Sequence, residues 1–225
     1  MAVQTAPTQV TISISQGYLR AKRLFDLLFT LLFLIPIGIV TLIVALLIRL
    51  DSEGPIFYRQ KRVGLNGVEF EMIKFRSMYV NCDDARHREA IKQYMNGEKL
   101  NEGEETSNPY KLEKDPRITR VGRFIRKTSI DELPQFWNVL RGEMTLVGPR
   151  PPVPYEVEYY SSHDWLRLCG KPGLTGTWQV YGRSKVPFET MVDMDIEYLQ
   201  EQSFWKDLKL IALTIPVMLK ARGGA

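Results

Sequence analysis

The sequence predicts an α+β fold, mostly helical, in which a compact cytoplasmic domain with short strands is anchored by an N-terminal membrane helix and by interfacial amphipathic helices. Three observations predict it: a long charge-free apolar run near the N-terminus, short alternating segments bounded by glycine and asparagine, and amphipathic stretches towards the C-terminus. The 225 residues are enough for one ordinary domain and a short extra segment. We expect a mobile N-terminal tail over 1–20, a membrane helix over 21–50 and a cytoplasmic domain over 51–225.

Composition narrows the functional classes. Apolar residues make up 44% of the chain and charged residues 25%, which excludes disorder throughout, and a single long apolar run excludes a polytopic transporter. The net charge of +4 suits membrane phospholipids or phosphorylated substrates and does not require nucleic acid. The two cysteines and the two histidines are far apart, which argues against disulfides, zinc-thiolate and histidine metal sites. Mg²⁺ on carboxylates is therefore the first metal candidate.

The apolar run Leu27 to Ile48 contains no charged residue and, as a helix, could cross a hydrocarbon core of about 30 Å. A single transmembrane span is one interpretation. Pro36 lies in the middle, where its ring and missing N–H break or kink a helix. Each half, Leu24–Ile35 or Ile37–Ile48, is then about 18 Å long and too short to cross alone.

Both flanks of this run are basic, with Lys22 and Arg23 before it and Arg49, Arg59, Lys61 and Arg62 after it. A straight span would place one basic flank outside, against the tendency of positive charges to stay in the cytoplasm. We therefore favour a re-entrant hairpin, broken at Pro36, that dips into the membrane and returns. The freed carbonyls at the break would need partners within the protein.

A hairpin and a polar loop are expected next. Leu65-Asn66-Gly67 is typical of a hairpin turn, and alternation over 68–78 places four side chains on one strand face: Phe70, Met72, Lys74 and Arg76. Lys74 and Arg76 either face solvent or bind an anion. Residues 83–95 are expected to form a helix, and 96–109 a mobile loop.

A basic stretch precedes two adjacent acids. Within this stretch, which runs from Arg117 to Lys127, Arg120, Arg123 and Lys127 share a helical face that suits solvent, lipid headgroups or phosphate, and Arg126 lies in the same stretch. Then Ser129-Ile130-Asp131-Glu132 has the capping-box pattern, and an apolar stripe leads to a C-cap at Gly142: Leu133, Phe136, Trp137 and Leu140. Acids are common at helix N-termini, but Asp131 and Glu132 beside these cations would also suit Mg²⁺ and a diphosphate.

The last third of the chain offers a rigid loop and two helices. Pro149 and Pro151 hold Arg150 in a fixed backbone frame, and a guanidinium fork suits phosphate oxygens. A surface loop is the alternative. A glycine-rich turn at 171–176 precedes Arg183, but neither segment is a nucleotide-binding motif. Residues 187–202 predict an amphipathic helix, and 204–220 a second one that fits either the core or the membrane interface.

Six segments, in this order, resemble the bacterial sugar transferase family, the monotopic polyprenyl-phosphate phosphoglycosyltransferases. They are Lys22-Arg23-Leu24-Phe25-Asp26, Lys74-Phe75-Arg76-Ser77-Met78, Asp115-Pro116-Arg117, Ser129-Ile130-Asp131-Glu132-Leu133-Pro134-Gln135, Leu146-Val147-Gly148-Pro149-Arg150-Pro151 and Lys171-Pro172-Gly173-Leu174-Thr175-Gly176. The resemblance runs from about residue 22 to about residue 219. Small departures are Ile35 before the proline, where some members have serine, and a longer acidic loop over 96–109.

The resemblance implies a reaction. Such enzymes transfer a sugar-1-phosphate from a UDP-sugar to polyprenyl (undecaprenyl) phosphate, releasing UMP and initiating capsule, exopolysaccharide or O-antigen synthesis. It also implies Mg²⁺ as cofactor and a location on the cytoplasmic face of the bacterial inner membrane. The sugar is left open, with an unmodified hexose favoured, and a homodimer is neither required nor excluded.

The resemblance also implies roles for particular residues. Asp131 is the nucleophile that forms a covalent phosphosugar intermediate, and Glu132 is a general base or a metal ligand. Arg150, within Pro149–Pro151, contacts the nucleotide, and Asp207 matches another acid of the family's site. Because the substrate is an anion, cations must offset charge in the transition state, and we expect these to be Arg126, Arg150 and Arg183, with Lys74 and Arg76 behind them.

Two other hypotheses remain. The first is a non-enzymatic, membrane-anchored adaptor that uses the basic stretch 117–127 to bind anionic lipid or an acidic partner, and it predicts that Asp131 is dispensable. The second is a one-step glycosyltransferase in which Asp131 and Glu132 only bind metal, and it predicts release of a nucleoside diphosphate.

Overall fold

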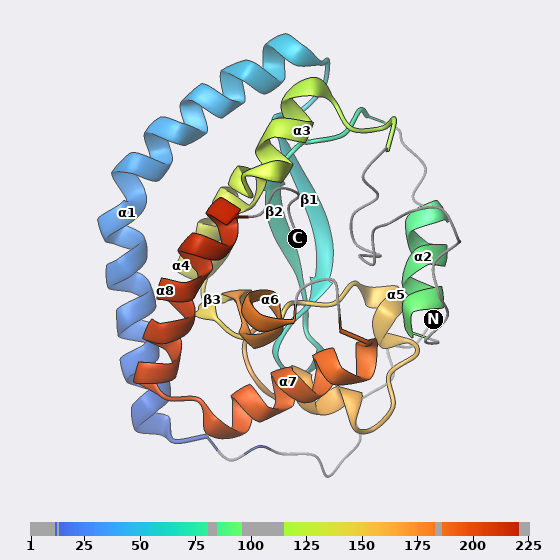
Figure 1. Ribbon diagram of the computed structural model, residues 1–225. Coiled ribbons are helices and arrows are strands. Elements are labelled where there is room, and N and C mark those ends of the chain that lie inside the picture. Colours follow the sequence, from blue (N-terminus) through green and yellow to red (C-terminus); the bar gives the residue numbers. More distant parts are fainter. Residues whose placement is uncertain (1–11, 13, 81–84, 96–114, 183–185, 221–225) are drawn as a thin grey trace.

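The computed structural model describes residues 12, 14–80, 85–95, 115–182 and 186–220 (Figure 1). Within these residues the fold is mostly helical with short strands, as predicted. The α-helices are α1 (Gln16–Asp51), α2 (Ala85–Met95), α3 (Arg120–Lys127), α4 (Phe136–Arg141), α5 (Pro154–Val157), α6 (Thr177–Tyr181), α7 (Phe188–Glu201) and α8 (Phe204–Lys220). The strands are β1 (Phe57–Val63), β2 (Glu69–Phe75), β3 (Thr145–Val147) and β4 (Gly173–Thr175). The 3₁₀ helices are η1 (Leu65–Gly67), η2 (Ile130–Gln135) and η3 (Asp164–Cys169).

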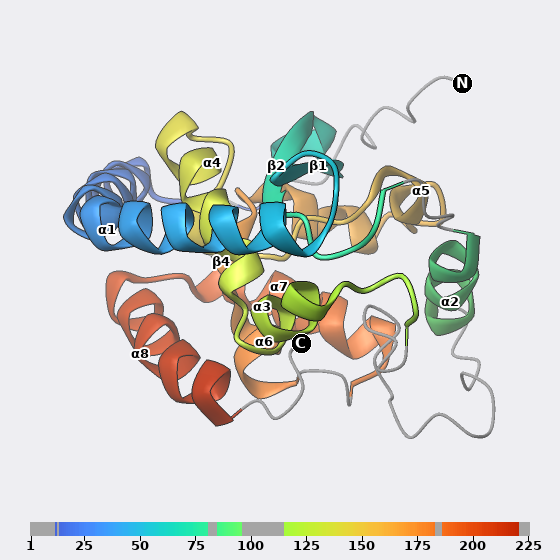
Figure 2. The ribbon, with the colours of Figure 1, turned by 90° about the horizontal axis from the view of Figure 1, so that it is seen from above.

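The helix α1 is continuous, so the predicted break at Pro36 is wrong. Instead the helix bends in its middle part, as both ribbon views show (Figures 1 and 2). A proline inside a long helix removes one hydrogen bond and forces a kink, but the turns on either side can still continue. The helix also begins at Gln16, inside the segment predicted as a tail. By length and composition α1 could cross a membrane, and its apolar side chains near the bend are exposed, Ile35 at 75%.

Each end of α1 contacts the rest of the protein. Near its start, Arg23 donates hydrogen bonds of 2.5 and 2.8 Å to two carbonyls of α4, while Asp26 accepts from Thr145 Oγ1 at 2.6 Å. In its second half, Val44 and Ile48 pack against β2 and α3. The helix therefore leaves and rejoins the same body, with exposed apolar side chains between the two attachments.

The described strands form two sheets of two strands each. β1 and β2 form the predicted antiparallel hairpin, from Phe57 opposite Phe75 to Val63 opposite Glu69. The turn is η1, where Asn66 adopts φ 55°, a left-handed conformation that asparagine tolerates well. β3 and β4 form a short parallel pair further along the chain.

The main core lies under α7. The apolar face predicted for 187–202 is confirmed, because Phe188, Met191, Val192, Ile196 and Leu199 are all buried. The first four of these join one cluster with side chains from β1, α5, η3 and α6.

The start of η2 differs from the prediction. Ser129 makes no side-chain cap and adopts φ 56°, so the capping box is wrong, and Ile130–Gln135 winds as a 3₁₀ helix. Pro134 lacks an N–H and cannot donate the hydrogen bond that a regular α-helix would need at this position.

The buried face of α4 also differs from the apolar stripe predicted after Asp131. Trp137 is 51% exposed and lies beneath the guanidinium of Arg141, whereas Asn138 and Val139 are buried. Asn138 binds the edge of β2, accepting from Ile73 N at 3.1 Å and donating to a strand carbonyl at 2.7 Å. This amide fixes α4, and η2 before it, against β2.

Candidate active site

The two adjacent acids lie between α3 and β2. The left-handed Ser129 turns the chain sharply after α3, so that η2 begins at once with Asp131 and Glu132. The start of α3 is capped by Thr119, whose Oγ1 accepts from Gly122 N at 2.9 Å. A Cβ at Gly122 would lie 2.0 Å from the carbonyl oxygen of Ser77, so only glycine allows α3 to approach the end of β2 this closely.

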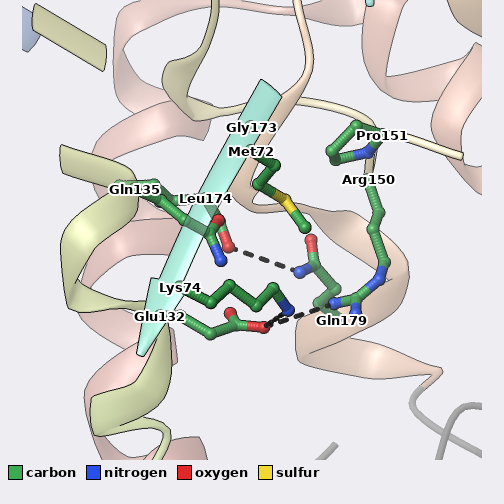
Figure 3. Close-up of a pocket in the computed structure, with 9 residues that line it drawn as sticks. All are labelled: Met72, Lys74, Glu132, Gln135, Arg150, Pro151, Gly173, Leu174 and Gln179. Atoms are coloured by element: carbon green, nitrogen blue, oxygen red, sulfur yellow. Dashed lines mark hydrogen bonds and ion pairs between the residues drawn. The ribbon is translucent and has the colours of Figure 1, made fainter. Parts of the chain in front are cut away.

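One carboxylate oxygen of Glu132, on η2, lies close to cations from β2 and from the loop after β3. Lys74 Nζ, on β2, donates to Glu132 Oε1 at 2.9 Å, and Arg150 Nη1 lies 3.9 Å from the same oxygen (Figure 3). Burial lowers the pKa of Lys74. The negative charge of Glu132 opposes this shift, and the positive charge of Arg150 adds to it. The arrangement is thus a carboxylate between two partly desolvated cations, whose mutual interactions are stronger than in water.

Arg126, at the end of α3, is close enough to both acids for their charges to act on it. Burial lowers its pKa, and the nearby charge that opposes this most is that of Asp131. Asp131 is 7% exposed. The structure therefore brings together five residues of the predicted site: Lys74, Arg126, Asp131, Glu132 and Arg150.

A narrow pocket opens beside the Lys74–Glu132 pair (Figure 3). Its volume is about 10 Å³, roughly the room of one water molecule. It is lined by Met72, Lys74, Glu132, Gln135, Arg150, Pro151, Gly173, Leu174 and Gln179. Sequence reasoning missed Gln135 and Gln179, since an isolated glutamine carries no spacing signal.

Arg76, a predicted site residue, makes its contacts elsewhere. Arg76 follows the end of β2, is 5% exposed, and donates to the carbonyls of Ser52, at 2.7 Å, and Glu53. It thereby fastens the segment after α1 and does not line the pocket. Arg183 lies outside the residues that the structure describes, as does the predicted loop over 96–109.

Asp207, at the start of α8, lies in a buried cluster of its own. It accepts from Lys22 Nζ at 2.5 Å, from Tyr198 OH at 2.5 Å and from Tyr18 OH at 2.7 Å. Two of these donors, Lys22 and Tyr18, belong to α1. The contacts of Asp207 therefore attach the start of α1 to α7 and α8, and this residue does not line the pocket.

The donor chemistry of Asp131 and Glu132 fits Mg²⁺ bound together with a diphosphate. In the described part of the chain, no group of three or more His, Cys, Asp or Glu residues could hold a metal ion by itself. Mg²⁺ commonly uses one or two carboxylates, several waters and substrate phosphates. Two adjacent carboxylates bordered by three cations match that pattern, since the cations would receive the remaining phosphate charge.

Comparisons with known proteins identify the family of the chain. A family description, "Bacterial sugar transferase", matches residues 17–221. The chain is 44% identical over 208 residues to the galactosyl transferase CpsE of Streptococcus agalactiae, covering 92% of this chain and 44% of that protein. It is 41% identical over 203 residues to the undecaprenyl-phosphate galactose phosphotransferase of Salmonella typhimurium, covering 90% of this chain and 41% of that protein.

Another relative matches over nearly its whole length. The exopolysaccharide production protein ExoY of Sinorhizobium fredii is 40% identical over 229 residues, which cover 99% of this chain and 98% of that protein. The chain thus spans less than half the length of the first two relatives and almost all of the third. With the family match covering residues 17–221, the chain belongs to the bacterial sugar transferase family.

Proposed function

We propose that this protein transfers a sugar-1-phosphate from a UDP-sugar to undecaprenyl phosphate, releasing UMP and initiating the synthesis of a capsule, an exopolysaccharide or an O-antigen. The observation that carries the proposal is the convergence of Lys74, Arg126 and Arg150 on Asp131 and Glu132. Three cations around two carboxylates suit a reaction at a diphosphate, where phosphate charge must be offset. The family match and the name of the Salmonella typhimurium relative, an undecaprenyl-phosphate galactose phosphotransferase, point to the same chemistry.

In the proposed first step, a carboxylate oxygen of Asp131 attacks the phosphorus that carries the sugar. The bond between that phosphorus and the bridging oxygen breaks, and UMP leaves with the electron pair. The product is an aspartyl-phosphosugar. Lys74, Arg126 and Arg150 stabilise the charge on the phosphate oxygens while this bond breaks.

In the second step, an oxygen of undecaprenyl phosphate attacks the same phosphorus, and Asp131 leaves as a carboxylate. Glu132 takes the proton of an acceptor phosphate that arrives singly protonated. Splitting the transfer lets a water-soluble donor and a lipid acceptor use the site in turn. Mg²⁺, when bound by Asp131 and Glu132, would neutralise diphosphate charge.

The narrowness of the pocket also has a role in this scheme. Glu132 occupies the space between Lys74 and Arg150, at 2.9 and 3.9 Å from their nitrogens. The phosphates of an incoming donor would compete with Glu132 for these two cations. Donor binding should therefore free the carboxylate of Glu132 when it is needed as a base or a metal ligand.

We further propose that α1 re-enters the cytoplasmic leaflet of the inner membrane and returns. Its two ends contact one body, and its bent middle exposes only apolar side chains. Two further surfaces suit the membrane interface: Phe124 among Arg120 and Arg123 on α3, and Trp205 on α8. In this placement the site would lie near the phosphate of a lipid acceptor.

The decisive experiment identifies the nucleotide product. The purified protein in liposomes is supplied with Mg²⁺, undecaprenyl phosphate and either UDP-galactose or UDP-glucose. The Salmonella typhimurium relative is named for galactose, and a relative in Komagataeibacter xylinus is named an undecaprenyl-phosphate glucose phosphotransferase. We expect UMP, and the Asp131→Asn variant should produce none. Release of UDP would overturn the two-step mechanism, and no turnover with any UDP-sugar would favour the adaptor.

A further inference from the structure

The segment Pro149–Pro152 presents Arg150 to the pocket. It is held by hydrogen bonds that come from residues outside the segment. Three of its four residues are prolines, which have no N–H to donate. All four of its carbonyls nevertheless accept a hydrogen bond. The donors, in chain order, are Gly173 N at 2.9 Å, Arg167 Nη2 at 3.2 Å, Arg62 Nη1 at 2.8 Å and Val63 N at 2.9 Å.

Two of these four donors are buried arginine side chains. Arg167 is 1% exposed and donates to the carbonyl of Arg150 itself, while Arg62 is 4% exposed and donates to that of Pro151. A neutral donor would satisfy a carbonyl at far lower desolvation cost than a buried guanidinium. A rigid fork, however, fixes direction as well as distance.

The position of Arg167 is itself fixed from three sides. Its Nη2 also donates to Asp195 Oδ2 at 2.6 Å, on α7, and its Nη1 donates to Tyr160 OH at 2.9 Å. Glu156 Oε1, on α5, lies 3.7 Å from Nη1. Arg167 thus connects the buried carboxylates of α5 and α7 to the backbone of Arg150.

The chain of contacts leads directly into the pocket. The backbone of Arg150 is bound by Arg167, and its side chain lies 3.9 Å from Glu132 Oε1. A shift of the backbone at this point would move the guanidinium relative to Glu132 and Lys74. Small displacements of a positioned cation reduce transition-state stabilisation strongly.

We propose that Arg167 is a positioning residue for Arg150, and that Arg62 does the same for the adjoining Pro151. Arg167 touches neither substrate nor the reacting atoms, and it acts by holding the carbonyl that sets the direction of the Arg150 side chain. The inference rests on the proposed function, in which Arg150 binds the phosphates of the donor.

The test is a double-mutant cycle on KM and kcat for the UDP-sugar. Arg167→Lys keeps the charge beside Asp195 but loses the fork that reaches the carbonyl of Arg150. We expect kcat/KM to fall about tenfold, either because KM rises or because kcat falls. In an Arg150→Ala background the same change should alter kcat/KM less than about twofold, because the side chain that it positions is gone.

A matched control separates positioning from a loss of core stability. Tyr160→Phe removes one partner of the same guanidinium on the Nη1 side and leaves the bond from Nη2 to Arg150 in place. We expect this variant to lose clearly less kcat/KM than Arg167→Lys, because the bond from Nη2 to the carbonyl of Arg150 remains, and the thermal unfolding of both variants is measured in parallel. Equal losses in Tyr160→Phe and Arg167→Lys, or additive losses in the cycle, would overturn the proposal.

The outcomes also distinguish this inference from the proposed function. A wild-type protein that releases no UMP from any UDP-sugar refutes the function. An active wild type with an unaffected Arg167→Lys variant refutes only the positioning role. If Arg167→Lys fails to fold, Arg62→Lys carries the same cycle with Arg150→Ala, and additivity there counts against the proposal.

Discussion

The ammonium group of Lys74 lies 2.9 Å from Oε1 of Glu132, joining β2 to the 3₁₀ helix η2 across 58 positions of sequence. Both side chains are largely buried, 15% and 28% exposed, so the pair is only weakly screened by solvent. The packing of Asn138 against β2 brings the two residues together. The pair therefore depends on the fold around it as much as on its own charges.

Replacing Lys74 by methionine should lower kcat/KM by about 10²–10³-fold, because a cation that stabilises the phosphate charge is lost from a desolvated site. Release of UMP from the donor measures this. Lys61→Met is the matched control, since Lys61 is 74% exposed and lies 3.8 Å from Glu69 on the same hairpin. Equal activity of the two variants would contradict the assignment.

Sequence reasoning reached the site because its residues lie in short motifs. Asp131 and Glu132 belong to one segment and Arg150 to another, and the structure places Arg150 Nη1 3.9 Å from Glu132 Oε1. The roles of these residues remain predictions. Alternation placed Arg76 on the face of Lys74, but β2 ends at Phe75 and the arginine turns towards the segment after α1.

The supporting contacts could not be predicted in the same way. Arg167 lies in an apolar run, and Asp195 lies within the buried face of α7, next to Ile196. Charges in such positions indicate a buried ion pair, but no pattern tells which partner each one meets. The sequence predicts Lys22 and Arg23 as a basic flank of the membrane segment, but it does not predict that the charges of Lys22, Arg23 and Asp26 bind α8, α4 and β3.

Lys22→Met should destabilise the protein by about 3–5 kcal/mol, because it leaves the buried Asp207 without its cation. The side chains of this pair are 9% and 5% exposed. Unfolding followed in detergent measures the change. The exposed pair Arg59–Glu71 is the control, and Arg59→Met should cost less than about 1 kcal/mol. A loss for Lys22→Met no larger than for that control would mean that the pair of Lys22 and Asp207 does not stabilise the attachment of α1.

The topology of α1 can be tested with single cysteines at Ser15 and Glu53, both exposed residues beside its two ends. In a background without Cys82 and Cys169, a membrane-impermeant thiol reagent should label both positions only from the cytoplasmic side. The reason is that both ends contact one body. Labelling from opposite sides would establish a straight span.

The buried cluster around Arg167 should make stability depend on pH. Burial raises the pKa of Asp195 from 3.8 to about 6, although Arg167 partly opposes this, and Glu156 adds to the rise. A carboxyl with a raised pKa binds its proton more tightly in the folded state than in the unfolded state. Between pH 6 and pH 4 the folded state therefore gains stability as pH falls, and this gain is lost as pH rises through about 6.

The contribution of Asp195 can be isolated by comparing wild type with Asp195→Asn, whose amide does not titrate. A pKa moved from 3.8 to about 6 corresponds to about 3 kcal/mol, so the free energy of unfolding of wild type should rise relative to the variant by up to that amount as pH falls from 7 to 4. Denaturant unfolding at several pH values measures the difference. A difference that stays constant would show that Asp195 is ionised throughout this range, because Arg167 then outweighs the cost of burial.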